Sequence, residues 1–239
     1  MKIEKGAQLY RGKAKTLFET DQPDVLIAEF RDDTTAFDGA KKAALKDKGV
    51  VNNRISTFIM RFLAEKGVRT HFIEKLSDTE VAVRRLKMIP LESVVRNIAA
   101  GSLCRRLGIE SGLELKTPLY EIFLKNDALH DPMVSNEHAL AFGWANAQQL
   151  KQMRELSLQI NALLKELFAK AEMILVDAKY EFGVDAKGEM HLADEISPDS
   201  CRIWDAKTKE KLDKDRFRQD LGKVIESYEQ IASRIGADF

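Results

Sequence analysis

"LVDAKYEFG", residues 175–183, alternates apolar and charged side chains. A period of two is typical of a β-strand with one face in a core, so Asp177, Lys179 and Glu181 are expected to share the other face. An acid, a base and an acid on one face indicate either a solvated charged surface or a site for a metal and a charged substrate. Other segments of the sequence decide between these two interpretations.

The segment that follows, "VDAKGEMHLADEIS" at 184–197, predicts a hairpin that returns beside this strand. A two-residue loop at 187–188 would place Glu181 directly opposite Asp194, and facing acids repel each other unless a cation lies between them. Carboxylates, water and phosphate oxygens are the ligands that magnesium takes in nucleotide-using enzymes. Glu181 and Asp194 are therefore candidate metal ligands and, with Lys179, candidate catalytic residues. A slip of one residue in the register would turn Asp194 to the opposite face.

Length and composition indicate a globular protein that does not bind nucleic acid. The 239 residues are 44% hydrophobic and 32% charged, with 38 basic and 38 acidic side chains. Zero net charge provides no general attraction for nucleic acid, so any anion site must be local. The start is polar and no apolar run is long enough for a bilayer, which predicts a cytoplasmic chain without membrane association. Two cysteines, Cys104 and Cys201, are too few for a disulfide framework or a zinc site and are interpreted as small buried thiols.

Hydrophobic periodicity predicts an α+β fold in two parts. Strands are expected at 8–20, 25–30, 70–76, 80–87 and 91–98, with a loop at 31–40 and a helix within 50–67. Further helices are expected from about 146 to 171 and from 213 through 235. We expect a β-rich N-terminal subdomain, residues 1–88, packed on a larger α+β subdomain, residues 89–239, with a cleft between them.

The segment "QLYRGKAKTLFET", residues 8–20, carries a candidate phosphate site. A regular strand would place Arg11, Lys13 and Lys15 on one face and the small Ala14 on the other, where a flat ring could approach. The chain has neither a Walker A loop nor a G-x-G-x-x-G motif, so lysine point charges would contact the phosphates. A solvated lysine-rich edge strand is the alternative.

A second candidate anion site lies in "MIPLESVVRNIAAGSLCRRLG", residues 88–108. A strand is expected to end at Arg96, followed by small residues and a helix that begins near Ser102. A strand-borne arginine beside a serine at a helix start suits a phosphate monoester. A surface arginine at a strand end is the alternative.

These segments resemble the signatures of the SAICAR synthetase (phosphoribosylaminoimidazole-succinocarboxamide synthase) family. The similarity covers nearly the whole chain and includes "LYRGKAKT", "MIPLESVVRNIAAGS", "FLKNDALHDPMV", "LVDAKYEFG" and "DEISPDSCRIWD". The resemblance implies ATP-dependent amide formation between the carboxylate of the imidazole ribotide CAIR and the amine of L-aspartate, in purine biosynthesis. ADP and phosphate would be the other products, magnesium the metal, and a homodimer the assembly.

The resemblance also implies roles for individual residues. Lys13 and Lys15 match the lysines over the ATP phosphates, and Leu86 to Met88 match a hinge for adenine in a kinase-like or ATP-grasp-like subdomain. Glu181 and Asp194 match the magnesium-associated acids. The remaining matches are substrate residues: Arg96, Ser102 and Arg202 at the ribotide phosphate, Lys179 and Asp199 around the reacting carboxylate, and Lys125, Asp131 and Asp38 in pocket segments.

Other functions share some of these features. A small-molecule kinase would use ATP and magnesium without aspartate. A non-catalytic nucleotide- or RNA-binding module is the second alternative, and it would catalyse no reaction. His130 is interpreted as a structural histidine beside Asp131, with a general-base role as the alternative. In a ligase of this kind an acyl phosphate is the expected intermediate, because a carboxylate oxygen is a poor leaving group.

Overall fold

The fold is built around two antiparallel sheets. The computed structural model describes residues 3–36 and 40–237. One sheet has five strands in the order β1-β2-β3-β7-β6, with bounds Lys5–Arg11, Lys15–Thr20, Val25–Phe30, Glu80–Arg84 and Phe72–Lys75. The other has the path β10-β9-β8-β11-β12, with bounds Met133–Val134, Glu114–Leu124, Lys87–Ile98, Met173–Val184 and Met190–Ala193. A separate pair, β4 (Asp33–Ala36) and β5 (Lys41–Ala44), follows the first sheet in sequence.

Strand β11 is the centre of the second sheet and contains the segment 175–183. It pairs with β8 along one edge, and along the other with β13 (Cys201–Asp205) and then β12. Its apolar side chains are buried as predicted, with Ala178, Tyr180 and Phe182 in the main core. The predicted strand is therefore confirmed.

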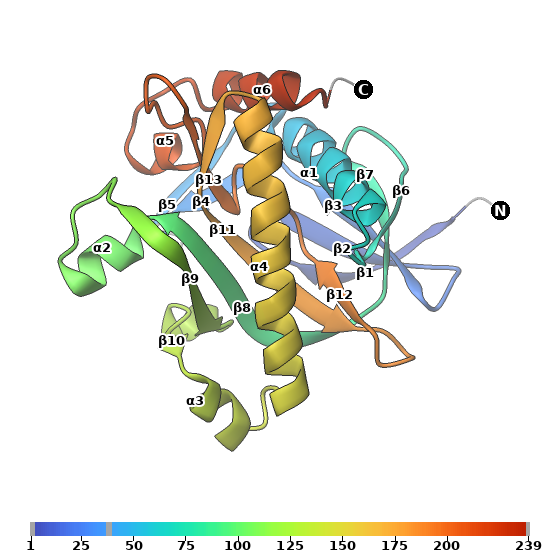
Figure 1. Ribbon diagram of the computed structural model, residues 1–239. Helices are drawn as coiled ribbons and strands as arrows, with labels where there is room; N and C mark the ends of the chain where they lie inside the picture. Colours follow the sequence, from blue (N-terminus) through green and yellow to red (C-terminus); the bar gives the residue numbers. More distant parts are fainter. Residues whose placement is uncertain (1–2, 37–39, 238–239) are drawn as a thin grey trace.

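Helices cover these sheets, as Figure 1 shows. The long helix α4 (Ala147–Lys170) crosses β8, β9 and β11, and its buried stripe includes Leu150, Met153, Ile160 and Phe168. It starts at a capping box between Asn146 and Gln149. The other helical elements are α1 (Lys48–Glu65), α2 (Ser102–Leu107), η1 (Asp127–Leu129), α3 (Asn136–Ala141), α5 (Asp215–Arg218) and α6 (Val224–Ile235). The predicted α+β class is confirmed.

The predicted register of the hairpin β11–β12 is wrong by one residue. Glu181 pairs with Ala193 and Val184 with Met190, so the loop has more residues than the two predicted. The cause is Asp185, whose carboxylate accepts hydrogen bonds from the backbone N–H groups of Lys187 and Glu189 at 2.9 Å each. This local cap stabilises a wider turn than sequence spacing indicates.

The first cationic strand is also different from the prediction. Residues 8–20 form two antiparallel strands, β1 and β2, because the chain turns at residues 12–14, where the Gly12 N–H donates to the carbonyl of Lys15 at 2.8 Å. Arg11 and Lys15 therefore lie on different strands, and the shared face predicted for Arg11, Lys13 and Lys15 does not exist. The predicted last helix is likewise interrupted between α5 and α6, where Asp220, Gly222 and Lys223 have positive φ.

The two sheets divide the sequence close to the predicted boundary. The five-stranded sheet ends at Arg84 and the other sheet begins at Lys87, while helix α1 from the N-terminal part packs into the main core beside α6. The subdomain boundary at residue 88 stays a prediction.

Candidate active site

A cluster of lysines and acids lies where β11, β12 and the first hairpin meet. We call it the lysine–acid cluster, and it consists of Lys15, Lys125, Lys179, Glu92, Glu181 and Asp194. Lys179 lies at its centre, with Nζ 2.5 Å from Glu181 Oε1, 3.0 Å from Glu92 Oε1 and 3.3 Å from Asp194 Oδ2. Lys15 binds Asp194, and Lys125 binds Glu181. Three candidate catalytic residues predicted from sequence are therefore brought together.

Asp194 reaches this cluster although the predicted register is wrong. Strand β12 ends at Ala193, and Asp194 takes a left-handed backbone conformation with φ of 59°. In a continued strand its side chain would point to the face opposite Glu181. The left-handed residue turns the carboxylate back toward Lys15 and Lys179.

Opposite charges in the lysine–acid cluster hold Asp194 and Lys179 in their charged forms. Burial acts to raise the pKa of the Asp194 carboxyl, but the neighbouring lysines outweigh it and hold that pKa well below its ordinary value. Burial acts to lower the pKa of Lys179, yet the three surrounding carboxylates raise it well above the ordinary value. Burial also raises the pKa of Glu92, the acid that pairs directly with Glu181 across β8 and β11. Asp194 and Lys179 therefore present fixed charges of opposite sign.

The residues predicted to contact ATP lie at the edge of this cluster. Lys13 projects from the first turn, and its Nζ lies 2.7 Å from Asp127 Oδ1. Ala14 lies beside it in the same turn, and its carbonyl accepts a hydrogen bond from the Arg31 N–H at 2.8 Å. A cavity of about 630 Å³ opens between this turn and the β4–β5 pair, lined in part by Arg11, Gly12, Lys13, Lys42 and Asp127. The basic turn thus borders open space.

Leu86 and Met88, the predicted adenine hinge, lie against Gly183 of β11. A Cβ on Gly183 would come within 2.8 Å of the Leu86 Cβ and 3.0 Å of the Met88 sulfur. Glycine is needed here because residues 86–88 lie too close to Gly183 to leave room for a side chain. Met88 remains 43% exposed, so apolar surface is available beside the cluster.

A second group, the arginine cluster, occupies the other end of the same face of β11. It consists of Arg96, Arg106, Arg202, Ser102, Glu121, Asp177 and Asp215. Arg96 Nη1 and Arg202 Nη1 both lie 2.9 Å from the same oxygen, Asp177 Oδ2. Arg96 Nη2 donates to Ser102 Oγ at 3.1 Å. The three residues predicted to bind the ribotide phosphate are thus brought together.

Gly101 allows the arginines to approach the start of α2. It has φ of 58° and ψ of −127°, and a Cβ there would lie 2.4 Å from Arg202 Nη2. A side chain at position 101 would displace the guanidinium, so glycine is required both by the backbone conformation and by the space.

Strand β11 sets the separation of the two clusters. Its pairing with β8 is regular from Asp177 to Glu181, so these two residues share one face at a spacing of about 13 Å. The arginine cluster lies at Asp177 and the lysine–acid cluster at Glu181. One extended ligand with an anionic group at each end could contact both.

The other predicted substrate residues are more scattered. Asp199 is buried and 2.9 Å from Lys48 Nζ, and it accepts a hydrogen bond from the Tyr228 hydroxyl at 2.8 Å, so it lies in a separate ion pair. Asp131 accepts the Asn126 N–H at 2.8 Å and closes the loop that follows Lys125. His130 lies in this loop with φ of 60°. Asp38 lies outside the described residues.

Several residues that hold these clusters in place are not identified by the sequence patterns. The alternation in 175–183 puts Asp177 on the charged face without indicating its role, and Glu92, Glu121 and Asp215 are further residues of this kind. Alternation from Arg96 back along "LESVVR" would have put Glu92 on the same face of β8. Glu121 and Asp215 come from elements distant in sequence, and no local pattern marks them.

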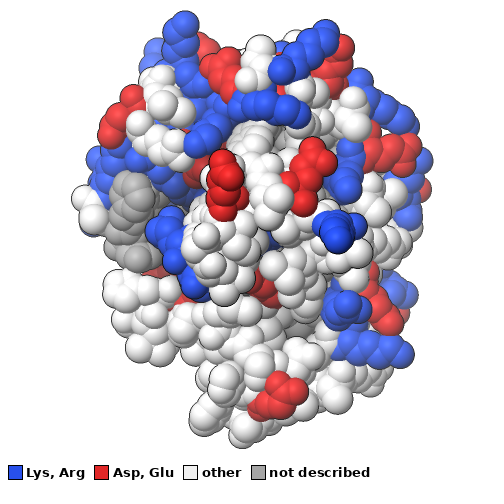
Figure 2. Space-filling view, turned by 60° about the vertical axis from the view of Figure 1, so that its left-hand side comes forward, with Lys and Arg blue, Asp and Glu red and all other residues white. Residues whose placement is uncertain are grey.

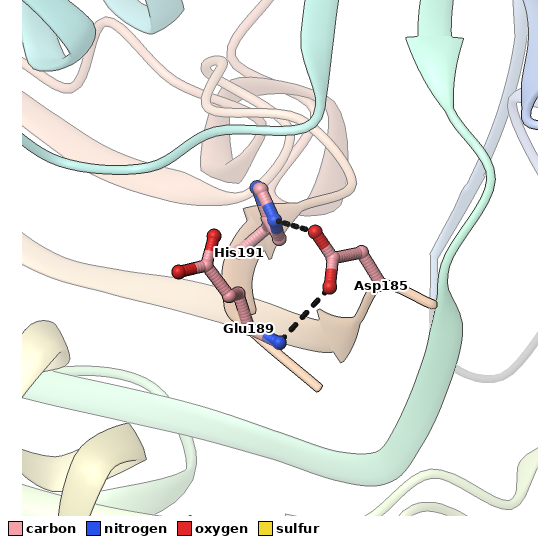
Figure 3. A group of neighbouring side chains, drawn as sticks. All are labelled: Asp185, Glu189 and His191. Carbon is pink, nitrogen blue, oxygen red and sulfur yellow. Dashed lines mark hydrogen bonds and ion pairs between the residues drawn. The ribbon is translucent and has the colours of Figure 1, made fainter. Parts of the chain in front are cut away.

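A further group of possible metal ligands lies in the hairpin loop and is separate from both clusters. Asp185, Glu189 and His191 have ligand atoms within 4.8 Å of one another (Figure 3). Asp185 is already bound by backbone N–H groups and by His191 Nε2 at 3.0 Å, and Glu189 pairs with Arg69 at 3.0 Å. These contacts explain the group as a cap of the hairpin.

The surface carries no dominant charge on the face seen in Figure 2. Basic and acidic side chains are interspersed over its upper part, and the lower part is mostly uncharged. This agrees with the zero net charge of the chain. Among the described helices, none is long and apolar enough to cross a membrane.

Comparison with known proteins gives a consistent result along the whole chain. Residues 8–235 match the SAICAR synthetase family. The chain is 66% identical over 234 residues to the phosphoribosylaminoimidazole-succinocarboxamide synthase of Coxiella burnetii, covering 98% of this chain and 97% of that protein. The crystal structure of the synthase from Ehrlichia chaffeensis superposes with a TM-score of 0.95 at 46% identity, covering 97% and 99% of the two chains. A SAICAR synthetase in complex with ADP has a TM-score of 0.92 at 50% identity, covering 95% and 96%.

Proposed function

This chain belongs to the SAICAR synthetase family, and from that premise we infer that it is an ATP-dependent ligase of purine biosynthesis. It joins the carboxylate of CAIR to the amine of L-aspartate, with release of ADP and phosphate. The observation that carries this assignment to named residues is the common face of β11, which has arginines at one end and lysines with acids at the other. CAIR has the matching form, because it carries a phosphate at one end and a carboxylate at the other.

The ribotide phosphate is assigned to the arginine cluster. Arg96, Arg202 and Ser102 supply guanidinium and hydroxyl donors, which suit phosphate oxygens. The buried acids of this cluster fix the arginines before the substrate arrives, so little rearrangement is needed on binding.

The reacting carboxylate and the ATP phosphates are assigned to the lysine–acid cluster. The ATP phosphates are assigned to Lys13 and Lys15 at the first turn, and the adenine is assigned to the surface of Leu86 and Met88. The neighbour solved with ADP supports a nucleotide as the co-substrate. Lys179 and Lys125 offset the negative charge that gathers when three anionic reactants meet.

The acids of this cluster fit a magnesium ion. Glu181 in β11 and Asp194, which follows β12, present hard carboxylate oxygens to the same ammonium, and such oxygens suit magnesium. Magnesium, when bound, neutralises charge on the phosphates of ATP. The residues of the chain position the CAIR carboxylate for phosphorylation by ATP, which forms an acyl phosphate and releases ADP. The aspartate amine then attacks the acyl carbon, and phosphate leaves. Lys125 and Asp131 border this region, and Asp199 is assigned a supporting position behind it.

Product analysis tests this function. Incubation of the protein with CAIR, ATP and L-aspartate should give SAICAR, identified by its mass, together with ADP. A small-molecule kinase would release ADP from CAIR and ATP equally well without aspartate. ADP release that is unaffected by aspartate, with no amide product, would overturn the ligase assignment.

Assembly and location extend the proposal. The family resemblance implies a homodimer in the cytoplasm, with a boundary at residue 88 between the nucleotide-binding and ribotide-binding parts. Sedimentation analysis of the purified chain tests the dimer directly.

A further inference from the structure

Lys179 is held by three carboxylates that come from three different parts of the sheet. Glu92 comes from β8, Glu181 from β11 itself, and Asp194 follows β12. An ammonium group has three N–H donors, and each is within reach of one of these acids. Two of the acids are the proposed magnesium ligands. The third, Glu92, has no role in the function described so far.

Nothing in the packing of β8 requires an acid at position 92. Glu92 pairs with Glu181 across the ladder, and like charges directly opposite each other destabilise a sheet. Its side chain is only 15% exposed, so water offers little compensation. The arrangement is tolerated because Lys179 Nζ lies 3.0 Å from one acid and 2.5 Å from the other. The contact with Lys179 therefore explains why an acid at position 92 is tolerated.

We propose that Glu92 is a positioning residue that keeps Lys179 in the active site when Glu181 and Asp194 bind a divalent cation. This proposal rests on the proposed metal site. Lys179 shares those two acids in the structure, so it must give them up when they ligate a metal. Glu92 is then the one remaining acid of the three that hold Lys179. It retains the ammonium beside the reacting carboxylate and offsets the repulsion between two cations.

The test is a double-mutant cycle read out by metal binding rather than by turnover. Mn²⁺ is titrated into the full chain without nucleotide, and the free ion is measured by electron paramagnetic resonance. Glu92→Gln should weaken Mn²⁺ binding about tenfold, which is the effect of losing one charge-assisted hydrogen bond. Lys179→Met should tighten binding because it removes the competing ammonium. In the Lys179→Met background, Glu92→Gln should change the affinity less than about twofold.

Controls separate this role from a structural one. Glu114→Gln, an exposed acid at the start of the neighbouring strand β9, removes the same charge without contact with Lys179 and should leave Mn²⁺ affinity unchanged. Glu92→Asp should restore part of the affinity, because it keeps the charge on a shorter side chain. Circular dichroism and thermal unfolding verify that each variant is folded, and Lys179→Gln replaces Lys179→Met if the latter is not.

The outcomes distinguish failure of the metal site from failure of this proposal. If Glu181→Gln leaves Mn²⁺ binding intact, or the unsubstituted chain binds none, the metal site itself is wrong. If Glu181→Gln abolishes binding but Glu92→Gln has no effect, Glu92 does not hold Lys179. An equal loss from Glu92→Gln with and without Lys179 would mean that Glu92 acts on the metal directly, which also overturns the proposal. The ligase assignment is tested separately by the mass of the product.

Discussion

Replacement of Asp177 by asparagine should lower the stability of the protein substantially. Asp177 is buried, and one of its two carboxylate oxygens, Oδ2, lies 2.9 Å from both Arg96 Nη1 and Arg202 Nη1. Asparagine keeps the size of the side chain but removes the charge that the buried Arg96 and the half-buried Arg202 share. Breaking a buried ion pair by removing one partner costs about 3–5 kcal/mol. Because Arg96 keeps Glu121 and Arg202 keeps Asp215, we expect the lower end, about 3 kcal/mol.

Urea unfolding followed by circular dichroism measures this change in the free energy of unfolding. For a chain of this size, a loss of about 3 kcal/mol corresponds to a decrease in Tm of roughly 6–12 °C. Asp78→Asn is the matched control, because Asp78 is 81% exposed and forms only a surface pair with Lys75. That control should stay within about 0.5 kcal/mol of the unsubstituted chain.

Inorganic phosphate adds a second readout to the same experiment. A phosphate ion can take the place of the lost carboxylate charge between Arg96 and Arg202, so phosphate should raise the Tm of Asp177→Asn more than that of the unsubstituted chain. Sodium chloride at equal ionic strength serves as the control. A loss below about 1 kcal/mol, or equal stabilisation of both proteins by phosphate, would refute the reasoning.

Three further predictions test other parts of the site. Glu181→Gln should reduce kcat by at least about a hundredfold in an ADP-release assay, since it removes charge from the reacting centre; turnover near that of the unsubstituted chain would contradict the assignment. Gly101→Ala should raise the KM for CAIR about tenfold, with the KM for ATP unchanged, because its Cβ would lie 2.4 Å from Arg202 Nη2; an unchanged CAIR value would exclude the positioning role. Burial and the nearby Asp215 raise the pKa of Asp213 to about 7, so the folded state holds a proton that the unfolded state releases near pH 4. The free energy of unfolding should therefore fall by up to about 1.4 kcal/mol per pH unit as the pH rises from about 4 to 7. Urea unfolding of Asp213→Asn at several pH values should lack this component, and parallel curves for the two proteins would rule it out.

Patterns that are local in the sequence gave correct predictions. The alternation in 175–183 predicted the buried and charged faces of β11, and the apolar spacing from about 146 to 171 predicted helix α4. Both signals depend only on neighbours along the chain, so tertiary context did not change them. The segments that carry the family resemblance also lie together at the site.

The failures occurred where backbone turns decide the geometry. The side-chain cap at Asp185 changed the hairpin register, and the turn that begins at Gly12 divided a predicted strand into two. Asp194 still reached the site, through a left-handed residue that periodicity does not predict. The side-chain partners of Arg96 come from β9, β11 and α2, and contacts between residues so far apart in the chain produce no pattern in the local sequence. Arg96→Ala would therefore remove a buried structural arginine as well as the proposed phosphate ligand.

The left-handed conformation of Asp194 has an evolutionary consequence. A non-glycine residue in that region costs about 1 kcal/mol, which glycine would avoid. Glycine would also eliminate the carboxylate that meets Lys15 and Lys179, and loss of these part-buried ion pairs costs more than the backbone strain that glycine would relieve. A library selected only for thermal survival and a library selected for turnover should therefore both keep the acid at position 194.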